Sequence, residues 1–179
     1  MLWQTRVGKG GTNGGVQWGM ASDGRNIYAS VSDVVRPPGG IGGPAPVGNA
    51  NLDPNIGGGI TALKIEDGSK VWFTPGVPCA PVRPGCSPAQ PGAVTVIDGA
   101  VFSGSMDGHI RAYSTADGKI IWDFDTRKTY TAVNGTPAKG GSLDGAGPVI
   151  AGGMVLVNSG YPRFGGEPGN VLLAFGLPN

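Results

Sequence analysis

Few side chains in this sequence could carry out chemistry by themselves. His109 is the only histidine and it follows an Asp-Gly turn, so a histidine-rich metal site is excluded and a catalytic triad is not expected. Glycine-rich nucleotide loops and paired catalytic carboxylates are not found in the sequence either. The sequence by itself therefore indicates no reaction mechanism.

Cys79 and Cys86 are the only cysteines, and six residues lie between them. Two cysteines in one loop without other metal ligands make a poor zinc site. A disulfide that closes the loop is the favoured interpretation, and it implies an oxidising compartment. Free thiols or a contact with a ligand remain open alternatives.

The composition indicates many short strands joined by many turns. Of 179 residues, 35 are glycine and 16 are proline, and between them stand short bursts of β-branched and aromatic residues. No segment shows a sustained period of 3.6, so almost no helix is expected.

The net charge of +1 gives no footprint for nucleic acid or a membrane surface. No apolar run reaches the ~18 residues of a membrane helix, and residues 1–5 do not resemble a signal peptide.

An eleven-residue phrase occurs twice, fifty positions apart. Residues 62–72 are ALKIEDGSKVW, and residues 112–122 are AYSTADGKIIW, with alanine, Asp-Gly and tryptophan at the same spacing. Alternating residues on both sides of an Asp-Gly turn predict a β-hairpin. Repetition at this period indicates one supersecondary unit that is used several times.

The alternating segments predict an all-β fold, a partial β-propeller of about three four-stranded antiparallel blades. The blades are expected at residues 12–74, 92–125 and 146–179, and residues 1–8 as the outer strand of a preceding blade. The expected strands, in chain order, are 2–5, 17–21, 27–32, 60–65, 70–73, 93–97, 100–105, 109–114, 119–124, 147–151, 154–159 and 171–175. Because three blades cannot close a ring, we expect the C-terminal portion of a larger propeller, whose N-terminal blades are missing here.

The lengths of the connections predict where a site lies. Successive strands of a blade alternate in direction, so the short turns fall on one face and the long segments 33–59, 74–92, 125–146 and 160–169 on the other. Long loops on a rigid scaffold are where binding and catalysis usually occur. Trp3, Trp72 and Trp122 are expected to pack between blades, whereas Trp18 lies outside the phrase and is either a flat platform for a ligand or a packing residue.

The phrase resembles the tryptophan-docking repeat of pyrroloquinoline quinone (PQQ) propellers. Further runs resemble the last blades of the polyvinyl-alcohol dehydrogenase family, and they are residues 101–113 (VFSGSMDGHIRAY), 122–126 (WDFDT), 133–135, 139–142, 158–161 and 169–175. The resemblance implies an eight-bladed propeller, located in the periplasm or secreted, that oxidises an alcohol with PQQ and passes electrons to a cytochrome c. It also implies a Ca²⁺ ion, whose ligands cannot be placed, and a haem c that is carried by a missing upstream segment or by a partner.

Site candidates come from the long-loop face and its inner strands. Asp144 is the candidate catalytic base or metal ligand. Lys139 and Arg163 are candidates for the carboxylates of the cofactor. The remaining candidates for cofactor binding are Trp18, Gln90, Asn134 and Ser142. A non-catalytic propeller of the outer-membrane-assembly type, which binds proteins, is the alternative function, since such propellers share the phrase.

Overall fold

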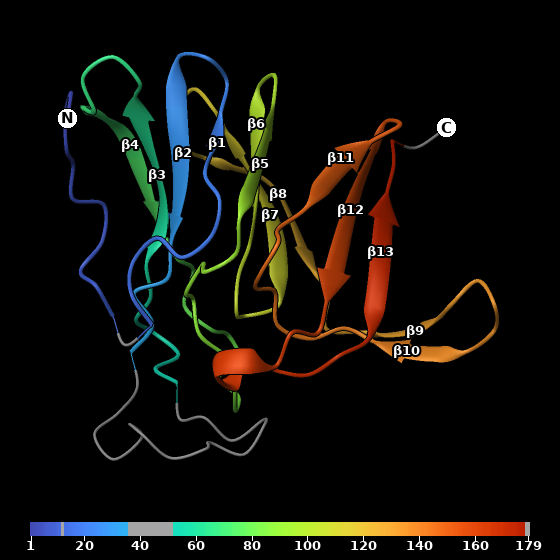
Figure 1. Ribbon diagram of the computed structural model, residues 1–179. Coiled ribbons are helices and arrows are strands. Elements are labelled where there is room, and N and C mark those ends of the chain that lie inside the picture. The colour runs from blue at the N-terminus through green and yellow to red at the C-terminus, as the bar shows by residue number, and fades with distance from the viewer. Residues whose placement is uncertain (12, 36–51, 178–179) are drawn as a thin grey trace.

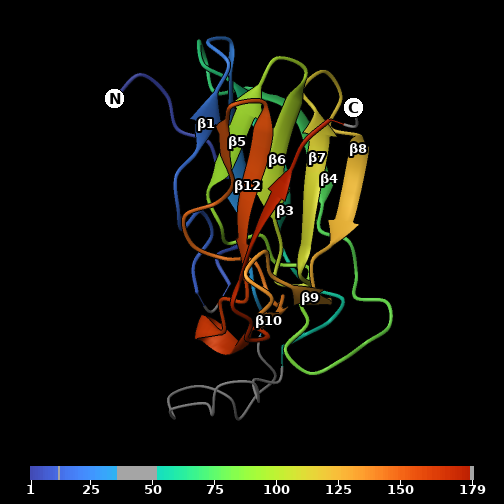
Figure 2. The ribbon, with the colours of Figure 1, turned by 90° about the vertical axis from the view of Figure 1, so that its right-hand side faces the viewer.

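The computed structural model describes residues 1–11, 13–35 and 52–177. Three antiparallel sheets stand side by side, as Figure 1 shows, and Figure 2 views them from the third sheet. The first contains β1 (Ala21–Ser22), β2 (Asn26–Val31), β3 (Gly59–Lys64) and β4 (Lys70–Pro75) in that order. The second contains β5 (Val94–Ile97), β6 (Ala100–Gly104), β7 (His109–Ser114) and β8 (Ile120–Asp125). The third contains β11 (Val149–Ala151), β12 (Met154–Ser159) and β13 (Val171–Phe175).

The all-β propeller prediction is confirmed by this arrangement. Among the described residues, the one helical element is η1 (Arg163–Gly165), a single 3₁₀ turn. Each sheet runs in a simple up-and-down order, and each pairing within it is antiparallel. Most of the predicted strands therefore occur in the expected order within the three sheets.

Three local expectations differ from the structure. Residues 1–8, expected as the outer strand of a preceding blade, form no strand, because they pair with no other strand of the described residues; Trp3 Nε1 nevertheless donates to the carbonyl of Ile65 (2.8 Å). The inner strand of the first blade, expected at residues 17–21, is reduced to the two residues of β1. The carbonyl of the preceding Gly19 accepts a hydrogen bond from Val94 N (3.2 Å), so this residue bonds to the next sheet. The long segment after β8 holds an unexpected hairpin of β9 (Thr129–Thr131) and β10 (Pro137–Lys139). Its strands are three residues each, too short for an alternation signal in the sequence.

The two copies of the repeated phrase fold in the same way. Ala62 pairs with Trp72 and Ala112 pairs with Trp122, and in both hairpins the register shifts directly after the alanine. Gly68 and Gly118 occupy the left-handed region, with φ of 69° and 72°, where a residue with a Cβ is strained. The shared turn chemistry therefore produces the same bulge and the same direction of the outer strand in both blades.

Tryptophan side chains join each blade to the next. The indole Nε1 of Trp72 donates to the carbonyl of Thr115 (2.9 Å), and Thr74 Oγ1 donates to the carbonyl of Gly118 (2.6 Å), both in the turn of the second blade. Tyr28 and Trp72 contact each other (ring centroids 5.8 Å apart) in a core shared with Tyr113. The predicted packing role of Trp72 is confirmed.

The second interface, between β5–β8 and β11–β13, is filled by aromatic rings. Trp122 lies 5.1 Å from the ring of Phe175 and 6.2 Å from that of Phe124, and Phe102 completes the cluster. Leu143 and Val157 are buried in the same core. Edge-to-face contacts of this kind add to the free energy gained by burial of the rings.

Substitution of Gly118 should test whether the indole contact holds the blades together. A Cβ at Gly118 would lie 2.6 Å from the Trp72 ring, whereas a Cβ at Gly99 (φ 80°) meets nothing within 4 Å. Both Gly→Ala changes incur about 1–2 kcal/mol of left-handed strain, and Gly118→Ala should cost about 1–3 kcal/mol more because of the overlap. Denaturant unfolding of the two variants gives the difference, and equal losses of stability would refute the proposed role of the contact.

Candidate functional site

The long connections gather at one end of the blades, as predicted. Figure 1 shows the β9–β10 hairpin and η1 at this end, and the short turns that join β1 to β2, β3 to β4 and β11 to β12 at the opposite end. Hydrogen bonds tie the long loops together: Gly160 N and Tyr161 N both donate to the carbonyl of Ser142 (3.1 and 3.0 Å). The end with the long loops is thus a connected surface.

Trp18 and Asp144 are brought together at this surface from segments 126 positions apart. The indole Nε1 of Trp18 donates to Asp144 Oδ1 (3.1 Å), and the backbone N–H of Gly145 donates to the same oxygen (2.5 Å). Asp144 is buried, with 4% of its surface exposed, whereas Trp18 is 45% exposed. The pair therefore combines an oriented carboxylate with an accessible aromatic face.

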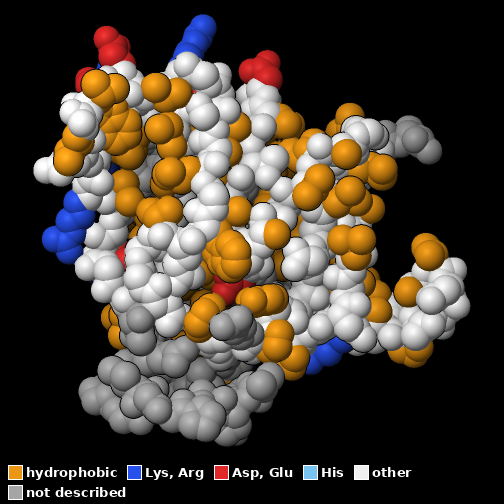
Figure 3. Space-filling view, in the orientation of Figure 1, with side chains coloured by type: hydrophobic (Ala, Val, Ile, Leu, Met, Phe, Trp, Pro, Cys, Tyr) orange, Lys and Arg blue, Asp and Glu red, His pale blue; other side chains and the backbone are white. Residues whose placement is uncertain are grey.

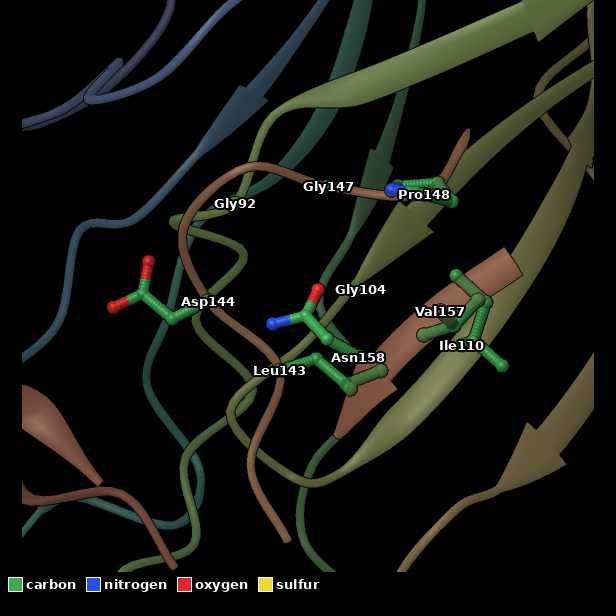
Figure 4. A pocket seen from close by; sticks show the side chains of 9 residues that line it. All are labelled: Gly92, Gly104, Ile110, Leu143, Asp144, Gly147, Pro148, Val157 and Asn158. Carbon is green, nitrogen blue, oxygen red and sulfur yellow. The ribbon is translucent and has the colours of Figure 1, made fainter. Parts of the chain in front are cut away.

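This arrangement could bind a flat molecule and exchange a proton with it. An exposed indole face favours planar and apolar ligands, and a fixed carboxylate beside it could act as a base. Figure 4 shows a small pocket next to Asp144, lined also by Leu143, Pro148 and Asn158. Its volume of about 10 Å³ has room for a single water at most, so a larger ligand would have to lie on the open surface of Trp18.

Gln90 and Ser142 are turned inward and make internal hydrogen bonds. Gln90 Nε2 donates to the hydroxyl of Tyr113 (2.9 Å), and its Oε1 accepts from Ser103 Oγ (2.9 Å). Ser142 Oγ donates to the carbonyl of Met106 (2.8 Å) and accepts from Glu167 N (2.7 Å). Both side chains are fully buried, and in this structure they hold strands and loops together.

Lys139 and Asn134 lie on the β9–β10 hairpin, which precedes Asp144 in the chain. Lys139 Nζ is 3.1 Å from Glu167 Oε1 and its side chain is 57% exposed. Asn134 is exposed at the tip, where its Oδ1 accepts from Thr136 N (3.1 Å). Arg163 belongs to η1 at the same end, but its side chain lies outside the described residues. Among the predicted site residues, the structure brings Trp18 and Asp144 into direct contact.

The predicted disulfide between Cys79 and Cys86 is present, with the two Cα atoms 6.3 Å apart. Both sulfur-bearing residues are almost fully buried. The loop that they close ends at Gly85 and Cys86, and a Cβ at Gly85 would lie 3.0 Å from the carbonyl oxygen of Gly165. The disulfide loop thus supports η1 at the long-loop end.

A charged network on the second blade was not identified from the sequence. Arg111 is 2% exposed, and its guanidinium contacts Asp107 Oδ2 (2.6 Å) and Asp123 Oδ2 (3.1 Å), while His109 Nδ1 lies 2.6 Å from Asp123 Oδ1. Burial opposes the charge on Arg111, but the Asp107 carboxylate outweighs it and raises the pKa of the guanidinium. The sequence signal for this network was the spacing of His109 and Arg111, because residues two positions apart on a strand such as β7 point to the same face.

Within the described residues, no three histidine, cysteine, aspartate or glutamate side chains come together as a group that could hold a metal ion. None of the helical segments in this part of the chain has the length and the apolar character needed to cross a membrane. The Arg111 network joins one histidine and three aspartates around a guanidinium, whose positive charge repels a cation.

Comparison with known sequences shows close similarity to alcohol-oxidising enzymes. Polyvinylalcohol dehydrogenase of Pseudomonas sp is 44% identical over an alignment of 188 positions that covers 99% of this chain and 27% of that enzyme. Polyvinylalcohol dehydrogenase of Sphingopyxis sp. (strain 113P3) is 39% identical over 98% of this chain and 27% of its own length. The 1-butanol dehydrogenase (cytochrome c) of Thauera butanivorans is 31% identical over 56% of this chain and 14% of its own. The chain thus spans about a quarter of the length of the first two relatives.

A family model for PQQ_2, described as outer membrane protein assembly factor BamB, matches residues 1–139 and again residues 56–175. Among solved structures, BamB from Moraxella catarrhalis aligns with a TM-score of 0.41 and 16% identity over 79% of this chain and 46% of that one. The computationally designed Ika4 protein aligns with a TM-score of 0.42 and 10% identity over 99% of this chain and 98% of that one.

The buried Tyr113 should make stability depend on alkaline pH. Burial raises the pKa of Tyr113 from 10.0 to about 12, so the unfolded chain loses this proton first as the pH rises. The stabilisation is complete below pH 10 and is lost between about pH 10 and 12, by up to about 3 kcal/mol.

Unfolding free energies measured from pH 8 to 12 should therefore fall more steeply for the wild-type chain than for Tyr113→Phe. Tyr28 and Tyr130 also have raised pKa values, with burial as the largest cause, and they remain in both proteins, so the difference isolates Tyr113. Identical slopes in the two proteins would contradict the assignment.

Proposed function

The chain belongs to the PQQ_2 family, and from that premise we propose that it forms part of the catalytic propeller of a PQQ-dependent alcohol dehydrogenase. The observation that carries the proposal is 44% identity to a polyvinylalcohol dehydrogenase over 99% of this chain. Polyvinyl alcohol or a similar secondary alcohol is the proposed substrate. The long-loop end, with Trp18 and Asp144, is the proposed place of contact with cofactor and substrate.

PQQ is a flat quinone that accepts two electrons from an alcohol. The residues present fit such a molecule in one respect, since the exposed indole of Trp18 offers a planar apolar surface at the inner edge of the blades. Because Asp144 Oδ1 accepts from the same indole, movement of the Trp18 ring is restrained. Asp144 would receive the proton that an alcohol hydroxyl loses on oxidation.

Lys139 and Arg163 are proposed to face the carboxylates of the cofactor, and Asn134 to hydrogen-bond at its rim. Lys139 Nζ lies 3.1 Å from the carboxylate of Glu167, so a carboxylate of the cofactor would share or replace this partner. Gln90 and Ser142 are proposed to act as supports, because their hydrogen bonds are used within the protein. Their removal would affect the site through the loops that they connect.

A Ca²⁺ ion at the cofactor is part of the proposal, with Asp144 as the candidate ligand on this chain. The described residues do not supply a cluster of carboxylates around it, and Ca²⁺ takes six to eight oxygen ligands. The other ligands would therefore come from outside the described residues. A direct fit of the ion to this part of the chain is not found.

A cytochrome c is proposed as the electron acceptor, supported by the name of the similar 1-butanol dehydrogenase (cytochrome c). A haem c on another segment or on a partner would serve this step. A periplasmic or extracellular location is proposed as well. It is supported by the disulfide between Cys79 and Cys86, because disulfides persist in oxidising compartments.

A scaffold that binds other proteins is the second candidate function. It is favoured by the description of the matching family model, an outer membrane protein assembly factor. A scaffold needs neither a carboxylate beside an exposed indole nor a cofactor. Binding of PQQ therefore separates the two candidates.

A chimera would test the proposed function directly. The matching segment of the Pseudomonas enzyme, 27% of its length, would be replaced by this chain, and oxidation of polyvinyl alcohol would be followed with PQQ, Ca²⁺ and a dye acceptor. The chimera should oxidise the polymer. Asp144→Asn, which keeps an acceptor for Trp18, should lower kcat about 10²–10⁴-fold if Asp144 is the base.

Asp98→Asn, at an exposed turn on the opposite end, is the matched control and should leave kcat unchanged. PQQ binding, measured by quenching of tryptophan fluorescence, should survive Asp144→Asn and weaken in Trp18→Ala. A folded chimera that never binds PQQ would favour the scaffold. Full activity in Asp144→Asn would remove Asp144 from the reaction.

A further inference from the structure

Phe164, in the middle of η1, has a backbone conformation that phenylalanine normally avoids. Its φ of 61° and ψ of 17° lie in the left-handed region, where the Cβ of an L-residue is crowded and glycine is preferred. Among the described residues, Asp33 is the other residue besides glycine with a positive φ. A bulky residue stays in this region only when its surroundings hold it there, and such strain is concentrated at active sites and ligand clamps.

The turn η1 is held by its neighbours on two sides. On one side, Tyr161 N donates to the carbonyl of Ser142 (3.0 Å), and Ser142 Oγ accepts from Glu167 N (2.7 Å). On the other side lies the loop closed by the disulfide, where a Cβ at Gly85 would be 3.0 Å from the carbonyl oxygen of Gly165. The backbone of the turn therefore cannot relax without breaking these contacts.

The same contacts connect η1 to the candidate site. Ser142 stands two residues before Asp144, and a Cβ on Gly166 would lie 2.7 Å from the Cβ of Ser142. This contact and two residues of chain on each side of it limit the distance between the Cα atoms of Phe164 and Asp144 to about 20 Å. Figures 1 and 2 both show η1 at the long-loop end, beneath the inner strands β1 and β5. Phe164 thus lies on the side of the molecule that carries the proposed site.

The strain at Phe164 keeps an aromatic ring partly in water. Phe164 is 36% exposed, and Trp18, which bonds to Asp144, is 45% exposed. Figure 3 shows hydrophobic side chains gathered around an acidic side chain on the long-loop side of the view. Folding gains less from a ring that stays partly exposed than from a buried one, so internal packing is a weak reason for the strain. A ligand that covers the ring supplies the missing burial.

We propose that the ring of Phe164 binds the hydrocarbon backbone of a polymeric secondary alcohol while one hydroxyl of the polymer is oxidised beside Asp144. The inference rests on the proposed function and names the residue that distinguishes a polymer from a small alcohol. Polyvinyl alcohol carries methylene groups between its hydroxyl-bearing carbons, and these groups are buried against the two aromatic faces of Trp18 and Phe164. A small alcohol at Asp144 does not extend to the second ring.

Two substitutions that both remove the ring test the proposal in the chimera described above. Phe164→Ala keeps the left-handed strain and Phe164→Gly relieves it, so the glycine variant should unfold at the higher denaturant concentration. In both variants KM for polyvinyl alcohol should rise about tenfold, as expected when part of one aromatic contact is lost, with kcat at saturation unchanged. KM for 2-propanol should stay within about twofold of the wild-type value, because this alcohol does not touch the ring.

Val133→Ala is the matched control, since Val133 is a fully exposed apolar residue on the β9–β10 hairpin at the same end. It should leave both KM values unchanged. A rise in KM for the polymer that appears only in the less stable Phe164→Ala variant would assign a structural role to the ring and overturn the proposal. Equal rises for both alcohols, or no rise for the polymer, would overturn it too. A wild-type chimera that oxidises neither alcohol would instead overturn the proposed function, and this inference with it.

Discussion

The first two blades of this protein are joined by an indole ring that lies on a glycine of the neighbouring turn. The Trp72 ring occupies the space that a Cβ on Gly118 would need, and the ring of Trp3 does the same at Gly68. Each indole also donates to a turn carbonyl, at 2.9 and 2.8 Å. Because the ring lies against the backbone of the turn, a side chain at Gly118 would push the first two blades apart.

The candidate site depends on that spacing. Trp18 precedes the inner strand of the first blade, whereas Asp144 precedes the inner strand of the third. Their hydrogen bond of 3.1 Å spans the inner edge of the second blade, so a small change in blade separation would break it. Ser142 bonds to Met106 and Glu167 and so supports the loop that carries Asp144. It acts on the site by holding this loop in position.

The third sheet differs from the first two at one position that they bury. Ile60 of β3 and Ile110 of β7 are fully buried between neighbouring sheets, whereas Leu172, at the equivalent place in β13, is 71% exposed. An apolar residue at this position is therefore buried by the packing of a neighbouring sheet and not by its own strand.

The sequence alone determined the repeated hairpins, since alternation and an Asp-Gly turn are local signals; it also indicated the disulfide and the end with the long loops. It did not separate the inward Gln90 from the exposed Asn134, because both are polar residues in long segments. Nor could it show that Trp18 meets Asp144, or that Arg111 is buried between two aspartates. Those relations were decided by the tertiary structure, because they join groups whose separation depends on how whole strands and blades pack, and no local pattern in the chain encodes that distance.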